Sequence, residues 1–529
     1  MKQSFYFLLI FIIVTTWSSC RKDFDFEPST GNLEFSRDTV YLDTVFTNIG
    51  SSTYNLKVYN RSNKDIVIPS IRLSNGYNSY YRMNIDGQVG ISDGTDESLG
   101  KIFENVELLA KDSMYIFIET TIDIESLSAT DNQFLYTDAI EFDSGQNLQK
   151  VELVTLVKDA IFIYPDKNSE GVVETLTFDV DGDGNADETE IQGRFLTNDE
   201  LHFTNEKPYV IYGYAAVGSG QTLTVDPGAR IHFHANSGLI VTTGGSLQIN
   251  GELSNNQEML ENEVIIQGDR LEPLFKDIPG QWGTIWLYNG SINNSINYTT
   301  IKNASVGLLV EGNQNEVNNK LTITNSQIYN SSNYGILGRA TSIFAENLVI
   351  NNSGQSSFAG TYGGKYNFTH CTITNYWSNS FRQFPALYLN NYFIDSEENI
   401  FTNNLEEANF NNCIIYGNDN PEFILEEETE SDFNFKFTNC LLRFQNTNNF
   451  YTNSNYDFED ELLYENVVFN QNPDFLDTEN NKMNIGESSA AKAMGSLSIS
   501  TMFNHDILGT LRTMPADIGA YQHVLFEED

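Results

Sequence analysis

Six oxygen-bearing side chains between residues 179 and 190 have the spacing of a calcium-binding loop. They are Asp179, Asp181, Asp183, Asn185, Asp187 and Glu190. Ca2+ takes about six to eight oxygen ligands, and Gly184 would allow the sharp turn that such a loop makes. Glu190 could bind through both carboxylate oxygens, and Asn185 would offer its backbone carbonyl. The spacing therefore predicts a structural Ca2+ site, although the same Asp-Gly pairs also favour an empty hairpin turn.

The segments on both sides of this loop are strand-like. Residues 172–178 and 191–196 are rich in β-branched and aromatic residues, which favour strands over helices. We therefore expect the loop to join two strands. A bound ion would stiffen a connecting segment at 161–205, between two domains.

His232 and His234 form a second candidate metal site. Side chains two residues apart on a strand face the same side, so both imidazoles would lie opposite Ile231 and Phe233. They could ligate a metal if a third ligand came from a neighbouring segment, but the sequence identifies none. The alternative is an exposed or capped pair without a metal.

Alternation also places Trp282, Thr284 and Trp286 on one face of a strand. Exposed tryptophan faces would suit stacking on a sugar ring. The segment 279–285 also resembles the Pro-Gly-x-Trp-Gly-x-Ile segment of early β-helix coils, in which the tryptophan packs. We therefore expect packing.

Catalytic residues cannot be assigned from the sequence, so an enzymatic role stays open. The acidic stretches 395–398 and 426–430 contain no nearby Lys or Arg that would neutralise a uronate. The chain has no serine nucleophile elbow and no phosphate-binding loop. Sites assembled from separate coils would escape such a linear search.

These candidate residues belong to a chain of 529 residues. That length is enough for more than one domain. It contains 27 Tyr, 36 Phe and only 11 Pro, a balance that favours strands. Its formal net charge of −43 would repel a polyanion, so nucleic acid is not an expected partner.

Residues 33–160 contain short alternating strands broken by turn residues. Candidate strands are 39–42, 44–46, 56–60, 66–68, 114–118 and 151–154. This pattern predicts a β-sandwich, and the segment resembles the immunoglobulin-like domains that begin many envelope proteins.

A repeat of the form apolar-x-Asn-x-x-apolar occupies the second half of the chain. The Asn-equivalent positions are 325, 347, 370, 412, 439 and 466, with separations of 22, 23, 42, 27 and 27 residues. A period near 22 predicts the coils of a parallel β-helix, here at 206–525. Cys371, Cys413 and Cys440 share one repeat position, which predicts a column of buried thiols. The Asn positions predict an amide ladder at a turn.

The C-terminal residues carry a family resemblance. They are Asn472, Pro473, Phe475, Asp506, Gly509, Arg512, Asp517, Ile518, Gly519, Ala520 and Tyr521. They resemble the closing coil of secreted, pectate-lyase-like right-handed parallel β-helix proteins, which end in an Asp-Ile-Gly-Ala-Tyr strand. The long flat face that parallel coils offer favours a scaffold that binds a glycan or a surface protein. The resemblance itself implies the alternative, a polysaccharide lyase or hydrolase.

The N-terminus resembles the signal peptide of a bacterial lipoprotein of the Bacteroidetes type. An apolar run at 5–14 is followed by Ser18-Ser19-Cys20, in which Cys20 would be acylated. The resemblance implies a signal peptide at 1–20, a tether at 21–32, and a lipid anchor in the bacterial outer membrane, on its periplasmic or its cell-surface face.

Overall fold

The computed structural model describes residues 25–127, 132–180, 183–312, 318–447 and 449–526. Cys20, and with it the predicted signal peptide and acylation site, lies outside these residues, as does Asp181. The chain divides into two compact units, residues 1–159 and 160–529. No helix in the described ranges is long and apolar enough to cross a membrane.

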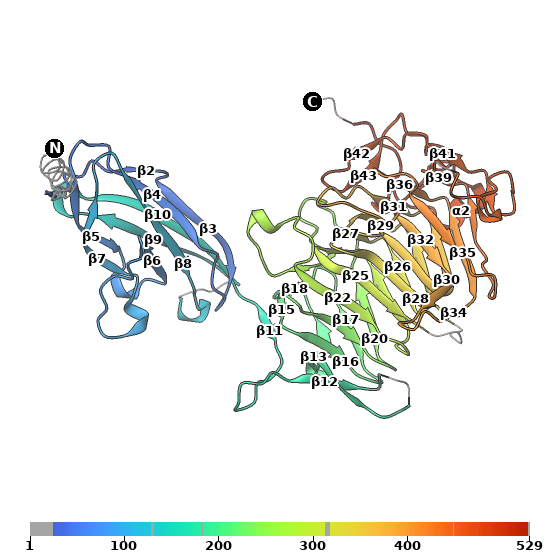
Figure 1. Ribbon diagram of the computed structural model, residues 1–529, viewed down its shortest axis with the longest axis horizontal. Coiled ribbons are helices and arrows are strands. Elements are labelled where there is room, and N and C mark those ends of the chain that lie inside the picture. The colour runs from blue at the N-terminus through green and yellow to red at the C-terminus, as the bar shows by residue number, and fades with distance from the viewer. Residues whose placement is uncertain (1–24, 128–131, 181–182, 313–317, 448, 527–529) are drawn as a thin grey trace, which may run out of the picture. The chain divides into compact units, whose positions relative to one another are not determined.

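The first unit contains two sheets that share one core (Figure 1). The 6-stranded sheet contains β1 (Glu27–Pro28), β5 (Ile66–Leu73), β9 (Gln133–Phe142), β10 (Gln149–Lys158), β3 (Thr39–Phe46) and β7 (Ile102–Leu108). The 4-stranded sheet contains β2 (Glu34–Phe35), β4 (Tyr54–Tyr59), β8 (Ser113–Thr120) and β6 (Tyr81–Ile85). Alternating residues of each sheet, such as Ile116 and Ile140, are fully buried between them. The strands expected from the sequence match β3, β4, β5, β8 and β10.

The second unit is dominated by large parallel sheets, which confirms the all-β class. One is an 11-stranded sheet of β11 (Ile161–Ile163), β15 (Tyr209–Ile211), β18 (Arg230–Phe233), β21 (Val264–Gly268), β24 (Thr299–Lys302), β27 (Gln327–Ser331), β29 (Val349–Ser353), β31 (Thr372–Asn375), β36 (Ile414–Gly417), β39 (Leu441–Leu442) and β41 (Val468–Phe469). Each of its strands pairs in parallel with the strand of the next turn of the chain.

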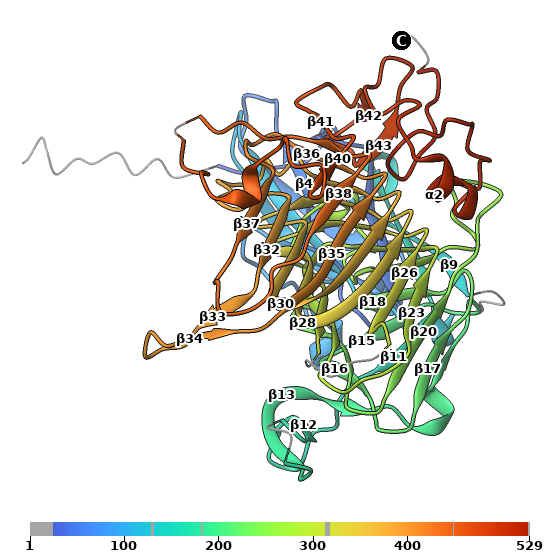
Figure 2. The same ribbon diagram turned by 90° about the vertical axis from the view of Figure 1, so that its right-hand side faces the viewer.

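An 18-stranded sheet covers the remaining faces of these turns (Figure 2). It contains β12 (Thr175–Phe178), β13 (Asp187–Phe195), β14 (His202–Phe203), β16 (Tyr214–Val217), β17 (Thr222–Val225), β19 (Gly238–Val241), β20 (Ser246–Asn250), β22 (Trp282–Leu287), β23 (Asn294–Asn297), β25 (Ala304–Glu311), β26 (Leu321–Thr324), β28 (Tyr334–Glu346), β30 (Phe358–Thr369), β32 (Leu387–Asn390), β35 (Leu405–Asn411), β37 (Phe423–Glu426), β38 (Lys436–Thr438) and β40 (Tyr464–Glu465). Its pairs are parallel, apart from the antiparallel pair β12–β13. This stacking of successive turns fits a parallel β-helix.

Two antiparallel hairpins and short helices complete the unit. The hairpins are β33 (Tyr392–Ile394) with β34 (Ile400–Thr402), and β42 (Phe475–Asp477) with β43 (Lys482–Ile485). The helices of the two units are η1 (Gly76–Asn78), η2 (Asp96–Ser98), η3 (Ile124–Ser126), η4 (Gly145–Asn147), η5 (Asn198–Glu200), η6 (Pro273–Phe275), η7 (Ser454–Tyr456) and α2 (Leu497–Met502).

Equivalent side chains stack along the inside of the coils. Ile301, Ile328, Ile350 and Ile373 occupy paired positions of four successive strands, and all are fully buried. Cys371, Cys413 and Cys440 are likewise fully buried in this core. The amides of Ile414 and Leu441 donate to the carbonyls of Cys371 and Cys413, 2.9 and 3.0 Å away, so these thiols lie at equivalent positions. The predicted cysteine column is confirmed.

The predicted amide ladder is confirmed at two of its five steps. All six Asn-equivalent residues have left-handed backbone angles, with φ between 48° and 54°. Asn347 Nδ2 donates to Asn325 Oδ1 at 3.0 Å, and Asn412 Nδ2 lies 2.9 Å from His370 Nε2. A second ladder, not predicted, joins Asn352 to Asn330 at 2.6 Å.

The prediction of a closing Asp-Ile-Gly-Ala-Tyr strand is wrong. Residues 517–521 form no strand. They lie against the 11-stranded sheet, where the Gly519 amide donates to the Asn412 carbonyl at 2.8 Å and the Ala520 amide to Thr372 Oγ1 at 3.0 Å. Gly519 has a φ of 87°, which an extended strand does not allow. The segment therefore covers earlier coils and does not add a last one.

Candidate functional site

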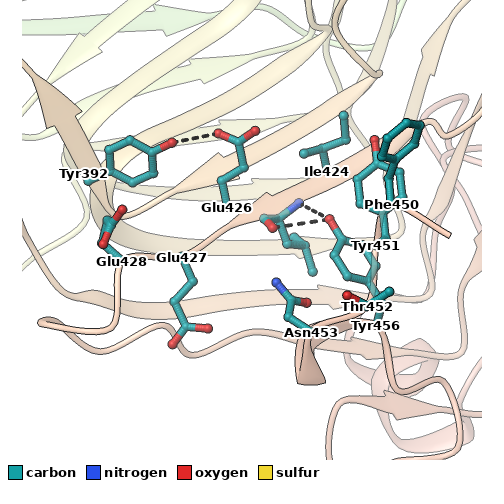
Figure 3. A pocket seen from close by; sticks show the side chains of 11 residues that line it. Tyr392, Ile424, Glu426, Glu427, Glu428, Phe450, Tyr451, Thr452, Asn453 and Tyr456 are labelled. Atoms are coloured by element: carbon teal, nitrogen blue, oxygen red, sulfur yellow. Dashed lines mark hydrogen bonds between the residues drawn. The ribbon is translucent and has the colours of Figure 1, made fainter. Parts of the chain in front are cut away.

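An open pocket on the flank of the coils is the strongest candidate site (Figure 3). Its volume is about 390 Å3. It is lined by Tyr392, Ile424, Leu425, Glu426, Glu427, Glu428, Phe450, Tyr451, Thr452, Asn453 and Tyr456. The lining combines four aromatic rings with three consecutive glutamates, and it contains no Lys, Arg or His. We call it the Glu426 pocket.

Strand β37 positions the acidic side of the pocket. Phe423 and Leu425 are buried in the core, so the alternating residues Ile424 and Glu426 face outward. The chain leaves the strand directly after Glu426, which places Glu427 and Glu428 at the pocket as well. β37 pairs in parallel with β32, and the hairpin strand β33 begins two residues after β32 ends.

Two tyrosine hydroxyls hold the carboxylate of Glu426. Tyr388 and Tyr392 donate to the same oxygen, Oε2, at 2.6 and 3.0 Å. Burial, together with the negative charge of Glu426, raises the pKa of Tyr392 to about 12, and the pKa of Tyr388 is raised further. Both hydroxyls therefore remain donors at neutral pH. Within the described chain no group donates to Oε1 of Glu426, which leaves that oxygen available to a ligand.

The aromatic side of the pocket comes from the segment around η7. Tyr456 is fixed because the Leu425 amide donates to its hydroxyl at 2.8 Å, and the ring of Tyr451 lies 5.0 Å from that of Tyr456. Phe450 is 79% exposed. Asn455 Nδ2 donates to Glu427 Oε2 at 2.9 Å, which joins the two sides. The pocket thus offers carboxylate acceptors beside aromatic faces.

The predicted calcium loop lies in a β-hairpin, as expected. Strands β12 and β13 pair antiparallel on either side of it. Asp179 Oδ2 accepts from the Gly184 amide at 3.0 Å, and Asp187 Oδ2 accepts from the Val180 amide at 3.0 Å. Hydrogen bonds from Asn185 lower the pKa of Asp183.

The structure describes all the predicted loop ligands except Asp181. Asp179, Asp183, Asn185, Asp187 and Glu190 all lie on the hairpin, but with Asp181 outside the described residues they form no cluster of three or more metal-binding side chains. The hairpin packs on the coils, because Tyr288 Oη donates to the Val180 carbonyl at 2.8 Å.

His232 and His234 have separate hydrogen-bond partners, and among the described residues they belong to no cluster of three or more metal-binding side chains. His232 is buried, and its Nδ1 lies 3.1 Å from the Gly268 carbonyl. His234 lies just beyond the end of β18, and its Nδ1 lies 2.7 Å from Asp269 Oδ2.

The expectation that Trp282 and Trp286 share a face is wrong, whereas the expectation of packing is confirmed for Trp282. Trp282 is buried in the tube and stacks on Phe233 with ring centroids 4.6 Å apart. Trp286 packs on the opposite side, against the β12–β13 hairpin. The reason is that Thr284 and Ile285 are both buried, so the alternation of β22 reverses between them, at the point where its pairing with β25 shifts register.

The sequence indicates the acidic stretch 426–430 but does not predict that aromatic residues join it in a pocket. The aromatic partners come from residues 388–392 and 450–456, in neighbouring coils. They lie outside the apolar-x-Asn-x-x-apolar repeat, in β32, β33 and the segment around η7, so the repeat does not predict them. A signal was available in the tyrosine-rich segments on both sides of the acidic stretch.

Comparison with known proteins assigns no family. No protein-family model matches the chain, and no curated protein matches it. Among solved structures, a family 123 glycoside hydrolase from Clostridium perfringens is 10% identical, with a TM-score of 0.16, over 24% of this chain and 26% of that one. The catalytic domain of a GH87 alpha-1,3-glucanase is 11% identical, with a TM-score of 0.17, over 75% of this chain and 80% of that one. This chain thus covers about a quarter of the first structure.

Proposed function

We propose that this chain is a bacterial cell-envelope protein whose β-helix, right-handed as in the family that it resembles, binds a neutral glycan in the Glu426 pocket. The observation that carries the proposal is the lining of that pocket: aromatic rings beside carboxylate acceptors, with no cationic side chain.

Sugars present two kinds of surface, and the pocket offers a partner for each. The C–H faces of a sugar ring pack on aromatic faces, here those of Phe450 and Tyr451. Sugar hydroxyls donate to carboxylates in charge-assisted hydrogen bonds, which are stronger than neutral ones. Glu426 Oε1 is suited to this role because the two tyrosines already hold Oε2.

The negative charge of the pocket distinguishes neutral glycans from acidic ones. Three glutamates line the pocket, and the whole chain carries a net charge of −43. A uronate or a sulfated sugar would be repelled, and no lining side chain would neutralise it. The expected ligand is therefore an uncharged oligosaccharide.

The remaining parts of the chain would present this pocket at the envelope. In this proposal Cys20 carries the lipid anchor in the outer membrane, and the first unit is an immunoglobulin-like spacer. Ca2+ bound by the Asp179–Glu190 loop would stiffen the β12–β13 hairpin. Labelling of the intact cells with a palmitate analogue, lost in Cys20→Ser, would test the anchor.

A glycan array tests the binding proposal. The mature chain is expected to bind neutral oligosaccharides and no uronate polymers. Glu426→Gln and Tyr451→Ala should lose the signal, whereas Glu461→Gln, an exposed glutamate outside the pocket, should keep it. Binding confined to acidic glycans, or unchanged in the pocket variants, would contradict the proposal.

The alternative is a glycan-cleaving enzyme at the same place. Paired carboxylates are the catalytic groups of most glycoside hydrolases, and the Glu426 pocket gathers three. Product analysis of each bound glycan separates the two functions, because a binding protein returns the glycan intact.

A further inference from the structure

A second cavity lies at the other end of the coils and has a different chemistry. Its volume is about 650 Å3, and its lining includes Tyr164, Lys167, Tyr212, His234, Ala235 and Asn236. Cavities of about 300–1,000 Å3 are the usual size of small-molecule sites. We call it the His234 cavity.

His234 and Asp269 form a hydrogen-bonded pair at this cavity. Strands β18 and β21 pair in parallel with Phe233 opposite Gly268, so the next residues of the two coils meet. His234 Nδ1 lies 2.7 Å from Asp269 Oδ2; the side chain of Asp269 is 7% exposed and that of His234 is 46% exposed. A carboxylate oxygen accepts, so Nδ1–H is the donor of this pair, and in the neutral imidazole Nε2 then holds the lone pair.

The plane of the imidazole is also fixed. The Tyr212 ring stacks on it, with centroids 4.3 Å apart and planes 23° apart. An imidazole oriented by a buried carboxylate, with the other nitrogen free to accept a proton, is the arrangement of a general base.

Ala235 and Asn236, which directly follow His234, also line the cavity. The Ser237 amide donates to the His234 carbonyl at 3.1 Å, which closes a turn whose central residues are Ala235 and Asn236. Asn236 has a φ of 59°. Among the described residues, nothing accepts a hydrogen bond from the amides of Ala235 and Asn236. Free N–H groups of this kind stabilise a developing oxyanion.

From these positions we propose that the His234 cavity hydrolyses carboxylic esters, an activity separate from glycan binding in the Glu426 pocket. His234 Nε2 takes a proton from water as the water oxygen bonds to the acyl carbon. The resulting oxyanion accepts hydrogen bonds from the Ala235 and Asn236 amides. The C–O bond to the alcohol then breaks, and the leaving oxygen takes the proton from the imidazolium. The products are a carboxylic acid and an alcohol, and no cofactor is consumed.

The substrate class follows from the lining. Tyr164 and Tyr212 provide aromatic faces, and Asp166, Lys167 and Gln192 provide polar groups. This combination suits a short acyl group on a hydroxylated ring, such as an acetylated sugar.

The test measures hydrolysis of 4-nitrophenyl acetate and of an acetylated oligosaccharide by the mature chain. His234→Gln is expected to lower kcat/KM about 100-fold, the scale of a lost general base. The matched control is His202→Gln, because His202 also pairs with a carboxylate, Asp226, at 2.9 Å but lies outside the cavity lining. The control should keep the wild-type rate.

Asp269 is a positioning residue, and Asp269→Asn separates its role from a structural one. We expect kcat to fall at least about tenfold with KM and thermal midpoint unchanged, because the imidazole loses its fixed tautomer. Nitrogen NMR of His234 should report that change of tautomer. The proposal is overturned if His234→Gln hydrolyses as fast as the wild type, or if the wild type is no faster than free imidazole at equal concentration. Glycan binding is measured in parallel and is independent of either result.

Discussion

At the scale of single residues, positions that recur in every coil could be predicted, and positions that occur once could not. The asparagine and cysteine columns repeat in the sequence because successive coils make the same turn and fill the same interior position. Tyr392, Glu426 and Tyr451 occur at strand ends, in a hairpin and in a loop that do not repeat from coil to coil. Only the pairing of coils brings them together, and that pairing depends on loop lengths that the sequence does not reveal.

His370 is the exception within the asparagine column, and it makes the fold sensitive to acid. Burial, with a contribution from Arg512, holds the pKa of His370 well below its usual range. The folded protein therefore keeps His370 neutral, while the unfolded chain takes up a proton below about pH 6.5. Stability present at neutral pH is lost as the pH falls below that value.

Replacement of His370 by the residue that other coils use tests this effect. His370→Asn should preserve the ladder and flatten the decline of the thermal midpoint between about pH 7 and 5. Thermal denaturation across that range checks it. An unchanged pH dependence in the variant would show that other groups control acid stability.

At the scale of elements, the β12–β13 hairpin was predicted correctly because β-branched residues flank a turn-rich loop. The face of Trp286 was predicted wrongly because Thr284 and Ile285 are both buried, where the pairing of β22 with β25 shifts register, and alternation alone contains no sign of this shift. The prediction of a closing strand was wrong for a related reason, because residues 517–521 form hydrogen bonds to earlier coils.

The hairpin loop yields a calcium prediction. If Ca2+ binds the folded loop and not the unfolded chain, it stabilises the second unit by about 2.7 kcal/mol at about 100 times its Kd. Calorimetric scans with calcium and with chelator should differ accordingly, and Glu190→Gln should remove the difference. Identical scans with calcium and chelator would favour the empty turn.

Another element, the loop between β31 and β32, is held by a buried ion pair. Arg382 donates two hydrogen bonds to Glu422, at 2.7 and 2.9 Å, and their side chains are 1% and 0% exposed. Glu422 also accepts from the Ala386 and Asp419 amides at 2.8 Å. Removal of one partner leaves a buried charge uncompensated.

Arg382→Met is therefore expected to destabilise the second unit by about 3–5 kcal/mol. Urea denaturation measures this change. Arg339→Met is the matched control, because Arg339 pairs with Glu311 at 2.9 Å but is 55% exposed, and exposed pairs contribute little. Equal losses in both variants would show that burial is not the cause.

At the scale of the whole molecule, the all-β class and the long repeat could be predicted because their signals recur many times along the chain. The interior of the coils has a chemical consequence that can be measured. Burial raises the pKa values of Cys371 and Cys413 well above their usual range, and neither thiol reaches solvent.

In a chain carrying Cys20→Ser, the three remaining thiols should not react with Ellman's reagent at neutral pH until the protein unfolds. In about 6 M guanidinium all three should react, because unfolding of the coils exposes every interior thiol. Rapid labelling of any thiol under native conditions would contradict the closed interior.

The central claim is that aromatic rings and a tyrosine-held carboxylate form a glycan site, and titration calorimetry with the best neutral oligosaccharide from the array tests it most directly. We expect binding by the wild type, loss of at least about tenfold in affinity for Tyr451→Ala, and no loss for Tyr41→Ala, an exposed tyrosine of the first unit. Equal affinity in all three proteins, or no heat of binding with any neutral glycan, would contradict the account.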